Sequence, residues 1–243
     1  MRIFLAGASG VIGRRLIPLL VGAGHTVIGT TRTPDKTKID ALKAAGARPF
    51  IIHAIDDRSW VVAMEETRPE VVIHQMTDLP DVIDPATLPD VLRRNSQLRV
   101  VGTANLVAAA RAVGARRLIA QSIAFAYAEG PEPHAETDPI ASPDGDTPAA
   151  ITARGVRALE DATVKTSGID GIVLRYGRLY GPGTWNTPNA RAPLHVDAAA
   201  HAALLALTRG TPGIYNIAED DGAVTIDKAR RELGFDPAFR LAP

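Results

Sequence analysis

The sequence contains no cysteine among its 243 residues, which excludes disulfide bonds, thiolate metal sites and a cysteine nucleophile. It also lacks an excess of charge, because 27 basic residues balance 27 acidic ones. Proteins that hold nucleic acids or membrane surfaces by long-range electrostatics carry a basic excess, so we expect neither partner. The six histidines are scattered without the paired spacing of a metal-binding motif, and we expect no metal site.

Long apolar runs are missing as well. No stretch reaches the roughly 20 apolar residues that a membrane-spanning helix needs. No basic start followed by a cleavable apolar segment marks a signal peptide. We therefore expect a soluble, cytoplasmic protein.

The most informative segment is Met1–Gly13, with the sequence MRIFLAGASGVIG. An apolar strand pattern leads into Gly7, Gly10 and Gly13, and an apolar helical pattern begins at Val11. This order of strand, glycine turn and helix indicates a dinucleotide-binding site. In such a site Gly7 permits the tight turn, Gly10 lets backbone N–H groups approach the pyrophosphate, and Gly13 lets the helix pack closely. The helix N-terminus then attracts the phosphates.

Strand and helix patterns alternate along the rest of the chain, which predicts a parallel sheet with helices on both faces. Further strands are expected at His25–Thr30, Pro49–Ile55, Glu70–His74, Arg117–Gln121, Gly171–Tyr176 and Gly213–Ile217. Helices are expected at Thr33–Ala45, Arg58–Glu66, Val91–Val113, Ile151–Thr166, Asp197–Thr208 and Ile226–Leu233. Ala128–Ala149, rich in proline and acidic residues, is expected to be a solvated loop or a lid. Asp197, and the pair Asp56 and Asp57, are expected to cap helices.

The residues that follow the second strand predict which cofactor is bound. In a dinucleotide fold this position meets the adenosine ribose, where an acidic residue selects NAD and an arginine accommodates the 2′-phosphate of NADP. Here the position carries Thr31, followed by Arg32. We therefore predict that NADP(H) is preferred over NAD(H), the alternative being that Arg32 is an ordinary surface charge.

Several collinear blocks resemble the short-chain dehydrogenase/reductase superfamily, in its extended branch of NAD-dependent epimerases and dehydratases. They are GASGVIG at 7–13, GTANLVAAARAVGARRLI at 102–119, SIAFAY at 122–127, LRYGRLYGPG at 174–183, HVDAAAHAALLAL at 195–207 and GIYNIAE at 213–219. The resemblance implies an α/β fold with a Rossmann-type, doubly wound parallel sheet of about seven strands. It also implies a single domain over 1–243, in which 177–243 contribute a reduced substrate lobe.

The resemblance and the glycine turn together predict the cofactor contacts. The predicted cofactor-binding residues are Gly7, Ser9, Gly10, Val11, Ile12, Gly13, Thr31, Arg32, His53, Ala54, Ile55, Gln75, Met76, Thr77, Arg99, Gln121 and Tyr176. Within this set, Arg99 stands where the family has an asparagine, and His53 follows the third strand where the family often has an aspartate.

The catalytic motif of the family is absent. Those enzymes use a tyrosine and a lysine spaced YxxxK to exchange a proton with the substrate. Here the corresponding positions fall on Thr152 and Val156, neither of which can replace them. Tyr127 is the best remaining phenol for proton donation, with a packing role as the alternative, and Ser122 is expected to hydrogen-bond substrate or cofactor.

The substrate region is also shortened. In sugar-nucleotide enzymes several dozen residues separate the YGPG turn from the HVDD-type helix, whereas only 184–194 fill this gap here. A nucleotide sugar is therefore an unlikely substrate. Tyr180 and Trp185 are expected to line a smaller, more apolar pocket.

These observations predict an atypical NADP(H)-dependent oxidoreductase that acts on a small, non-nucleotide carbonyl or enone. The first alternative is a catalytically silent NADP(H)-binding protein that senses redox state or binds a partner, and a sugar-nucleotide epimerase or dehydratase is the weaker one. Family members often dimerise through two helices of each subunit, which here correspond to Val91–Val113 and Ile151–Thr166, so a homodimer is a further expectation.

Overall fold

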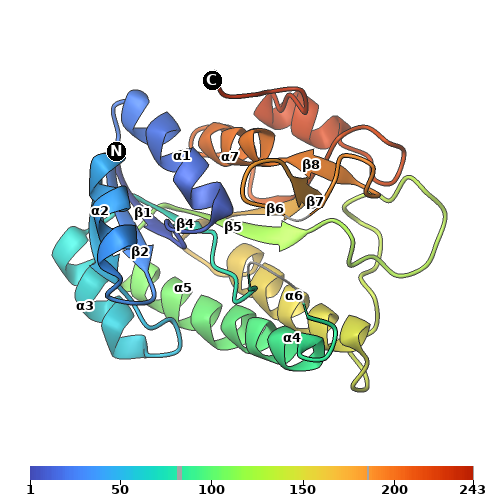
Figure 1. The fold of residues 1–243 in the computed structure, drawn as a ribbon, viewed down its shortest axis with the longest axis horizontal. Coiled ribbons are helices and arrows are strands. Elements are labelled where there is room, and N and C mark those ends of the chain that lie inside the picture. The colour runs from blue at the N-terminus through green and yellow to red at the C-terminus, as the bar shows by residue number, and fades with distance from the viewer. Residues whose placement is uncertain (81–83, 185, 243) are drawn as a thin grey trace.

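A computed structural model describes residues 1–80, 84–184 and 186–242. In this part of the chain seven parallel strands form one sheet in the order β3-β2-β1-β4-β5-β6-β9 (Figure 1). The strands are β1 (Arg2–Ala6), β2 (Thr26–Thr31), β3 (Ala47–Ile51), β4 (Val71–His74), β5 (Arg117–Ile123), β6 (Asp170–Tyr176) and β9 (Gly213–Ile217). The predicted doubly wound Rossmann-type fold is confirmed, with the largest boundary shift at β3.

Helices cover both faces of the sheet (Figure 1). One face carries α1, α2 and α7, and the other carries α3, α5 and α6, with α4 packed against α6. The helices are α1 (Val11–Gly22), α2 (Lys36–Ala44), α3 (Asp57–Thr67), α4 (Leu88–Gln97), α5 (Thr103–Ala112), α6 (Pro148–Val164) and α7 (Val196–Leu205). A parallel pair, β7 (Arg178–Tyr180) and β8 (Pro193–His195), lies beyond the end of β6.

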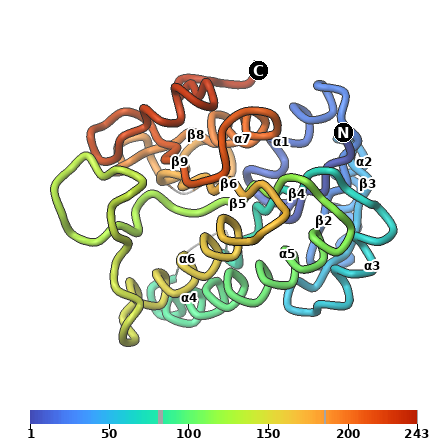
Figure 2. The backbone as a smooth tube through the Cα atoms, turned by 180° about the vertical axis from the view of Figure 1, so that it is seen from behind, coloured from blue at the N-terminus to red at the C-terminus, as the bar shows by residue number. Residues whose placement is uncertain are grey.

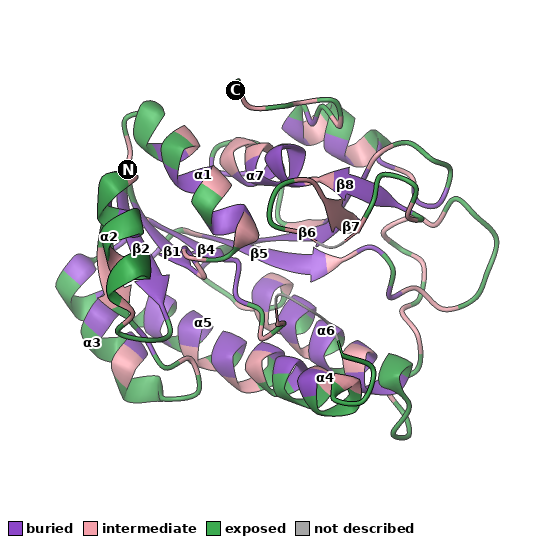
Figure 3. Cartoon of the chain, viewed as in Figure 1, coloured by how far each residue is buried: buried purple, intermediate pink, exposed green. Residues whose placement is uncertain are grey.

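The central strands are buried on both sides, as expected for a parallel sheet between helical layers (Figure 3). Alternate side chains of β1 enter different cores. Ile3 and Leu5 pack with α1 and α7, whereas Phe4 packs with Trp60 of α3 on the opposite face. This two-residue period explains why the strands consist of nearly continuous apolar runs.

The predicted helix Val91–Val113 is interrupted in the structure. One wider π-helical turn, η1 (Leu98–Gly102), separates α4 from α5. A Cβ on Gly102 would meet the Leu98 side chain at 2.9 Å and that of Ala54 at 3.4 Å, so the turn lies close to the segment after β3. The π-turn places Arg99 in the buried interior, at 4 % exposure.

Of the predicted helix caps, the one at Asp56 is confirmed and the one at Asp197 is wrong. Asp56 caps α3 by accepting from the Arg58 backbone N–H, as predicted. The cap predicted at Asp197 is wrong, because His195 is the N-cap of α7 and its Nδ1 accepts from the Asp197 N–H at 3.2 Å. The last helix, predicted at Ile226–Leu233, is confirmed over residues 227–233, where two α-helical residues lead into a π-helical turn, η2 (Ala229–Leu233).

The segment between β5 and α6 extends past the carboxyl end of the sheet (Figure 2). Contacts hold it at two places. Arg157 of α6 donates to the Ile140 carbonyl at 3.0 Å, and the His134 N–H donates to the Ala223 carbonyl at 3.0 Å. The loop therefore joins α6 to the C-terminal part of the chain.

Among the described residues, no helix combines the length and the apolarity needed to cross a membrane.

Candidate functional site

A cleft of about 460 Å³ opens at the carboxyl ends of β1, β2 and β4. This is the edge at which open parallel sheets bind their ligands. Eleven of the predicted cofactor residues line the cleft, namely Gly7, Ser9, Gly10, Thr31, Arg32, His53, Ala54, Ile55, Gln75, Met76 and Thr77. Segments from four different strand ends are thus brought together around one cavity.

The glycine turn leaves no room for side chains. Gly7 has φ +84°, and a Cβ on it would lie 2.5 Å from the Gln75 carbonyl oxygen. A Cβ on Gly13 would lie 2.5 Å from the carbonyl oxygens of both Gly7 and Ala8. Both positions therefore require glycine. Gly7 needs it for its backbone conformation and for the close approach of Gln75, and Gly13 needs it for close approach alone.

The beginning of α1 offers free donors to the cleft. Its N-cap is Gly10, which supplies no side-chain hydrogen bond to the first turn. Backbone N–H groups at the start of a helix then lack partners and attract anions. By contrast, the Gly7 N–H is already satisfied by Thr30 Oγ1 at 3.0 Å.

Gln75, which lines the cleft, carries an unsatisfied acceptor. The residue is 5 % exposed, and its Nε2 donates to the Tyr176 hydroxyl at 3.2 Å. Its Oε1 is buried and has no hydrogen-bond partner. A buried polar atom without a partner costs about 1–3 kcal/mol, so this oxygen fits a donor supplied by a bound molecule. The tight glycine turn, the uncapped helix and this oxygen together fit a dinucleotide.

The outer end of the cleft carries more charge than the sequence predicted. Arg32 Nη1 lies 2.5 Å from Asp78 Oδ1, and the other carboxylate oxygen of Asp78 lies 3.4 Å from Arg94 Nε. Lys38, in the first turns of α2, also lines this end and makes no ion pair with the described residues. Sequence reasoning missed Lys38, although its position shortly after the β2 exit was a usable signal.

Six predicted cofactor residues do not line the cleft: Val11, Ile12, Gly13, Arg99, Gln121 and Tyr176. Two of them act behind it. Gly13 permits the close packing of α1, and Tyr176 links Gln75 to α7, because its hydroxyl donates to the Ala199 carbonyl at 3.2 Å. Burial raises the pKa of the Tyr176 phenol far above its usual value.

Arg99 is a buried cation without a hydrogen-bond or ion-pair partner among the described residues. Burial lowers its pKa to about 10, an effect that Glu160 partly opposes. Its Cδ lies 3.2 Å from the position of a Cβ on Gly155, directly before the vacated lysine position Val156. Burial, followed by the charge of Arg99, also lowers the pKa of His74 to about 4.

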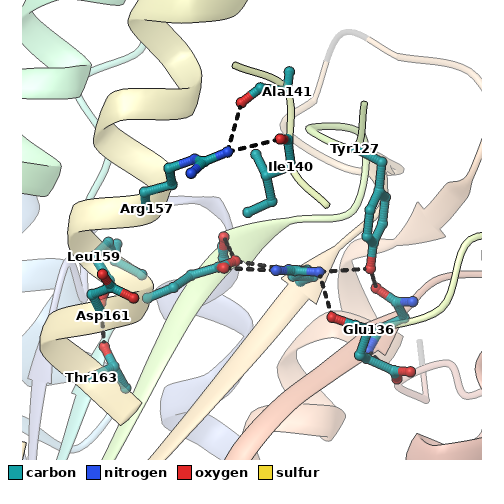
Figure 4. Close-up of polar contacts among 12 residues, drawn as sticks. Tyr127, Glu136, Ile140, Ala141, Arg157, Leu159, Asp161 and Thr163 are labelled. Carbon is teal, nitrogen blue, oxygen red and sulfur yellow. Dashed lines mark hydrogen bonds and ion pairs between the residues drawn. The ribbon is translucent and has the colours of Figure 1, made fainter. Parts of the chain in front are cut away.

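The two predicted catalytic residues belong to one largely buried polar chain, and Figure 4 shows its end at Tyr127. Ser122 Oγ donates to Glu160 Oε1 at 2.7 Å, and Glu160 forms a two-pronged ion pair with Arg175 at 2.8 and 2.7 Å. Arg175 in turn donates to the Tyr127 hydroxyl at 2.8 Å, and that hydroxyl donates to Asn216 Oδ1 at 2.6 Å.

These contacts determine what each hydroxyl can offer. The proton of Ser122 is committed to Glu160, so Ser122 can act toward a ligand as an acceptor. The proton of Tyr127 is committed to Asn216, and the ring is stacked on His134 at 4.8 Å. Burial raises the pKa of Tyr127, which further disfavours ionisation. A catalytic role for either residue stays a prediction.

The predicted substrate pocket is only partly described. The Tyr180 hydroxyl donates to Glu219 at 2.6 Å and accepts from Arg240 at 2.8 Å, and the residue does not line the cofactor cleft. Trp185 lies outside the described residues. A second cavity, of about 340 Å³, lies instead at the ends of β5 and β6, where Phe125, Tyr127 and Arg178 contribute to its wall.

The seven-stranded parallel sheet and the glycine turn at the start of α1 define a dinucleotide-binding α/β protein. The model of the NAD-dependent epimerase/dehydratase family matches residues 3–193. The chain therefore belongs to that family, which confirms the resemblance seen in the sequence.

A relative and two solved structures illustrate the range of the similarity. The 3-diazoavenalumate denitrifying reductase of a Streptomyces species is 39 % identical over 266 aligned residues, covering 99 % of this chain and 84 % of that protein. UDP-glucose 4-epimerase from Thermotoga maritima superposes with a TM-score of 0.79 at 18 % identity, covering 99 % and 94 % of the two chains. UDP-glucose 4-epimerase from Thermus thermophilus in complex with NAD superposes with a TM-score of 0.73 at 23 % identity, and the match covers 100 % of this chain and 86 % of that chain. At these identities the two epimerases show the fold alone.

Proposed function

We propose that the protein is an NADPH-dependent reductase of a small, non-nucleotide electrophile. The observation that carries the proposal is the cleft beside the glycine turn, with the unsatisfied Oε1 of Gln75, in a chain that lacks both residues of the proton-donating motif. The similar Streptomyces protein is named a reductase, which favours reduction over epimerisation. When bound, the reduced nicotinamide supplies a hydride.

The preference for NADPH rests on two cations at the outer end of the cleft. Arg32 and Lys38 lie where the adenosine ribose is held in this fold, and no carboxylate occupies position 31. Asp78 neutralises Arg32 at 2.5 Å, whereas Lys38, which lines the same end of the cleft, makes no ion pair with the described residues. A 2′-phosphate would bind between these two side chains, and NADH would gain nothing from them.

The missing tyrosine restricts the chemistry. Reduction of a carbonyl requires a proton at oxygen as well as a hydride at carbon. Thr152 and Val156 cannot supply that proton, and the Tyr127 proton is bound to Asn216. A cationic diazo group needs no proton, because hydride adds to the carbon while the C–N bond breaks and its electron pair leaves with N₂. The name of the similar reductase describes removal of nitrogen from a diazo compound, so we favour such a group over the carbonyl or enone.

Isotope transfer tests this proposal. The purified protein is mixed with NADPH carrying deuterium at C4 and, separately, with an arenediazonium carboxylate, an aromatic aldehyde and an enone. Enzyme-dependent deuterium in the arene, above a sample without protein, is the expected result. Labelled alcohol from the aldehyde would instead assign carbonyl reduction. Tight NADPH binding without label in any product would contradict the proposal.

The last outcome would favour the second candidate, a catalytically silent NADP(H)-binding protein. The commitment of both candidate hydroxyls, Ser122 and Tyr127, to internal partners is the observation that supports it. In that case the cofactor should alter binding of a partner protein without being consumed. The expected homodimer and the cytoplasmic location stay predictions, and light scattering with the pure protein tests the first of them.

A further inference from the structure

The second cavity has features that the dinucleotide site does not use. Its walls come from the segment after β5, from Arg178 at the start of β7, and from residues 191–192 and 223–224, beyond the carboxyl ends of β5, β6 and β9. Gln75 Nε2 in the cleft donates to the hydroxyl of Tyr176 at the end of β6, and the Tyr176 carbonyl accepts from the N–H of Ala124, which lines the second cavity, at 2.8 Å. Tyr176 therefore connects the wall of the cofactor cleft to the wall of this cavity.

Arg178 is the unusual charge in this cavity. Among the described residues it forms no ion pair and no side-chain hydrogen bond. Arg191, which lines the same cavity, is neutralised by Glu132. His134 lies 3.2 Å from Asp138, and Glu129 is exposed at the rim, where solvent screens its charge. Arg178 is thus the lining cation whose donors are available to a ligand.

Phe125 adds a flat apolar surface. Its side chain is 41 % exposed, which is unusual for phenylalanine, and the Arg178 guanidinium carbon lies 4.3 Å from its ring centroid. This contact with the ring positions the guanidinium, and its N–H groups can form two parallel hydrogen bonds to a carboxylate. The ring of Tyr127, in contrast, is covered by His134 at 4.8 Å and by Arg175 at 4.9 Å.

We infer that this cavity binds the substrate as a small aromatic carboxylate, with its carboxylate on Arg178 and its ring against Phe125. The inference rests on the proposed reductase function and names the substrate class for it. The volume of about 340 Å³ suits one ring with a short acidic side chain. The carboxylate anchors the molecule, so that its reactive group extends toward the cofactor cleft.

Calorimetric titration with three probes tests the inference, in the presence of NADP⁺. Cinnamate carries both features, cinnamamide lacks the charge, and cyclohexanecarboxylate lacks the aromatic ring. Cinnamate is expected to bind at least about tenfold more tightly than either of the others. Arg178→Met should remove most of the preference for cinnamate over cinnamamide, and Arg178→Lys should restore part of it, because charge returns without the planar fork.

The matched control is Arg111→Met, which makes the same change of net charge at an exposed position in the last turn of α5. Equal binding of cinnamate and cinnamamide, no binding of cinnamate, or equal losses in the Arg111 and Arg178 variants would each overturn the inference. Deuterium transfer without a carboxylate preference would overturn it while the reductase function stands. Carboxylate binding without hydride transfer to any substrate would overturn the reductase function while the carboxylate site stands.

Discussion

The buried pair of Glu160 and Arg175 allows a stability prediction with a worked magnitude. Both side chains are nearly inaccessible, at 6 % and 4 % exposure. Glu160→Gln keeps the shape of the side chain and still offers an oxygen that accepts from Ser122 Oγ. It removes the negative charge that offsets the buried guanidinium of Arg175. Burial disfavours the charge on Arg175, and Glu160 outweighs that effect and raises its pKa above the usual value. Removing one partner of such a pair costs about 3–5 kcal/mol.

This loss converts into a change of melting temperature. The entropy of unfolding is roughly 2.1 cal/mol/K per residue, which gives about 0.5 kcal/mol/K for a chain of 243 residues. The E160Q variant should therefore melt about 6–10 °C below the wild type. Calorimetry without cofactor, together with urea unfolding at neutral pH, measures the shift and the free energy.

The exposed pair of Arg48 and Glu66 provides the control. These side chains are 56 % and 49 % exposed, so Glu66→Gln should cost no more than about 1 kcal/mol. If E160Q is as stable as E66Q, burial of the Glu160–Arg175 pair does not determine its contribution, and the reasoning is refuted.

Three further predictions concern the cofactor site and its surroundings. Arg32→Ala and Lys38→Ala should each weaken NADPH binding about tenfold and leave NADH binding unchanged in calorimetric titration, and equal losses for both cofactors would contradict the assignment. Gly13→Ala should weaken NADPH binding and destabilise the fold by about 1–3 kcal/mol, because its Cβ would meet backbone oxygens at 2.5 Å. Gly22→Ala, in the same helix with nothing within 4 Å, should instead be neutral or stabilising. Because the folded pKa of His74, about 4, lies below the ordinary 6.5, the unfolded chain binds the extra proton and stability should fall by up to about 3 kcal/mol from pH 6.5 to pH 4. His74→Gln should flatten that pH profile, and an unchanged slope would exclude His74 as its source.

The sequence by itself determined the alternation of strands and helices and the glycine turn. Both are local properties, because side-chain periodicity and backbone conformation depend on neighbours in the chain. Gly7, Gly10 and Gly13 could therefore be assigned roles from their spacing alone, and Arg32 could be placed at the cleft from its position after β2. The missing tyrosine and lysine at Thr152 and Val156 were likewise visible as residue types.

Only the tertiary structure decided which polar groups meet. Gln75 and Tyr176 are 101 residues apart, and Ser122 and Glu160 are 38 apart, yet each pair forms one hydrogen bond. The unsatisfied oxygen of Gln75 and the commitment of Ser122 both follow from these contacts. Periodicity also could not predict the π-turn that buries Arg99, since it depends on packing against other segments. The direction of a hydrogen bond and the burial of a charge are properties of the assembled fold, because they require partners that the chain order does not specify.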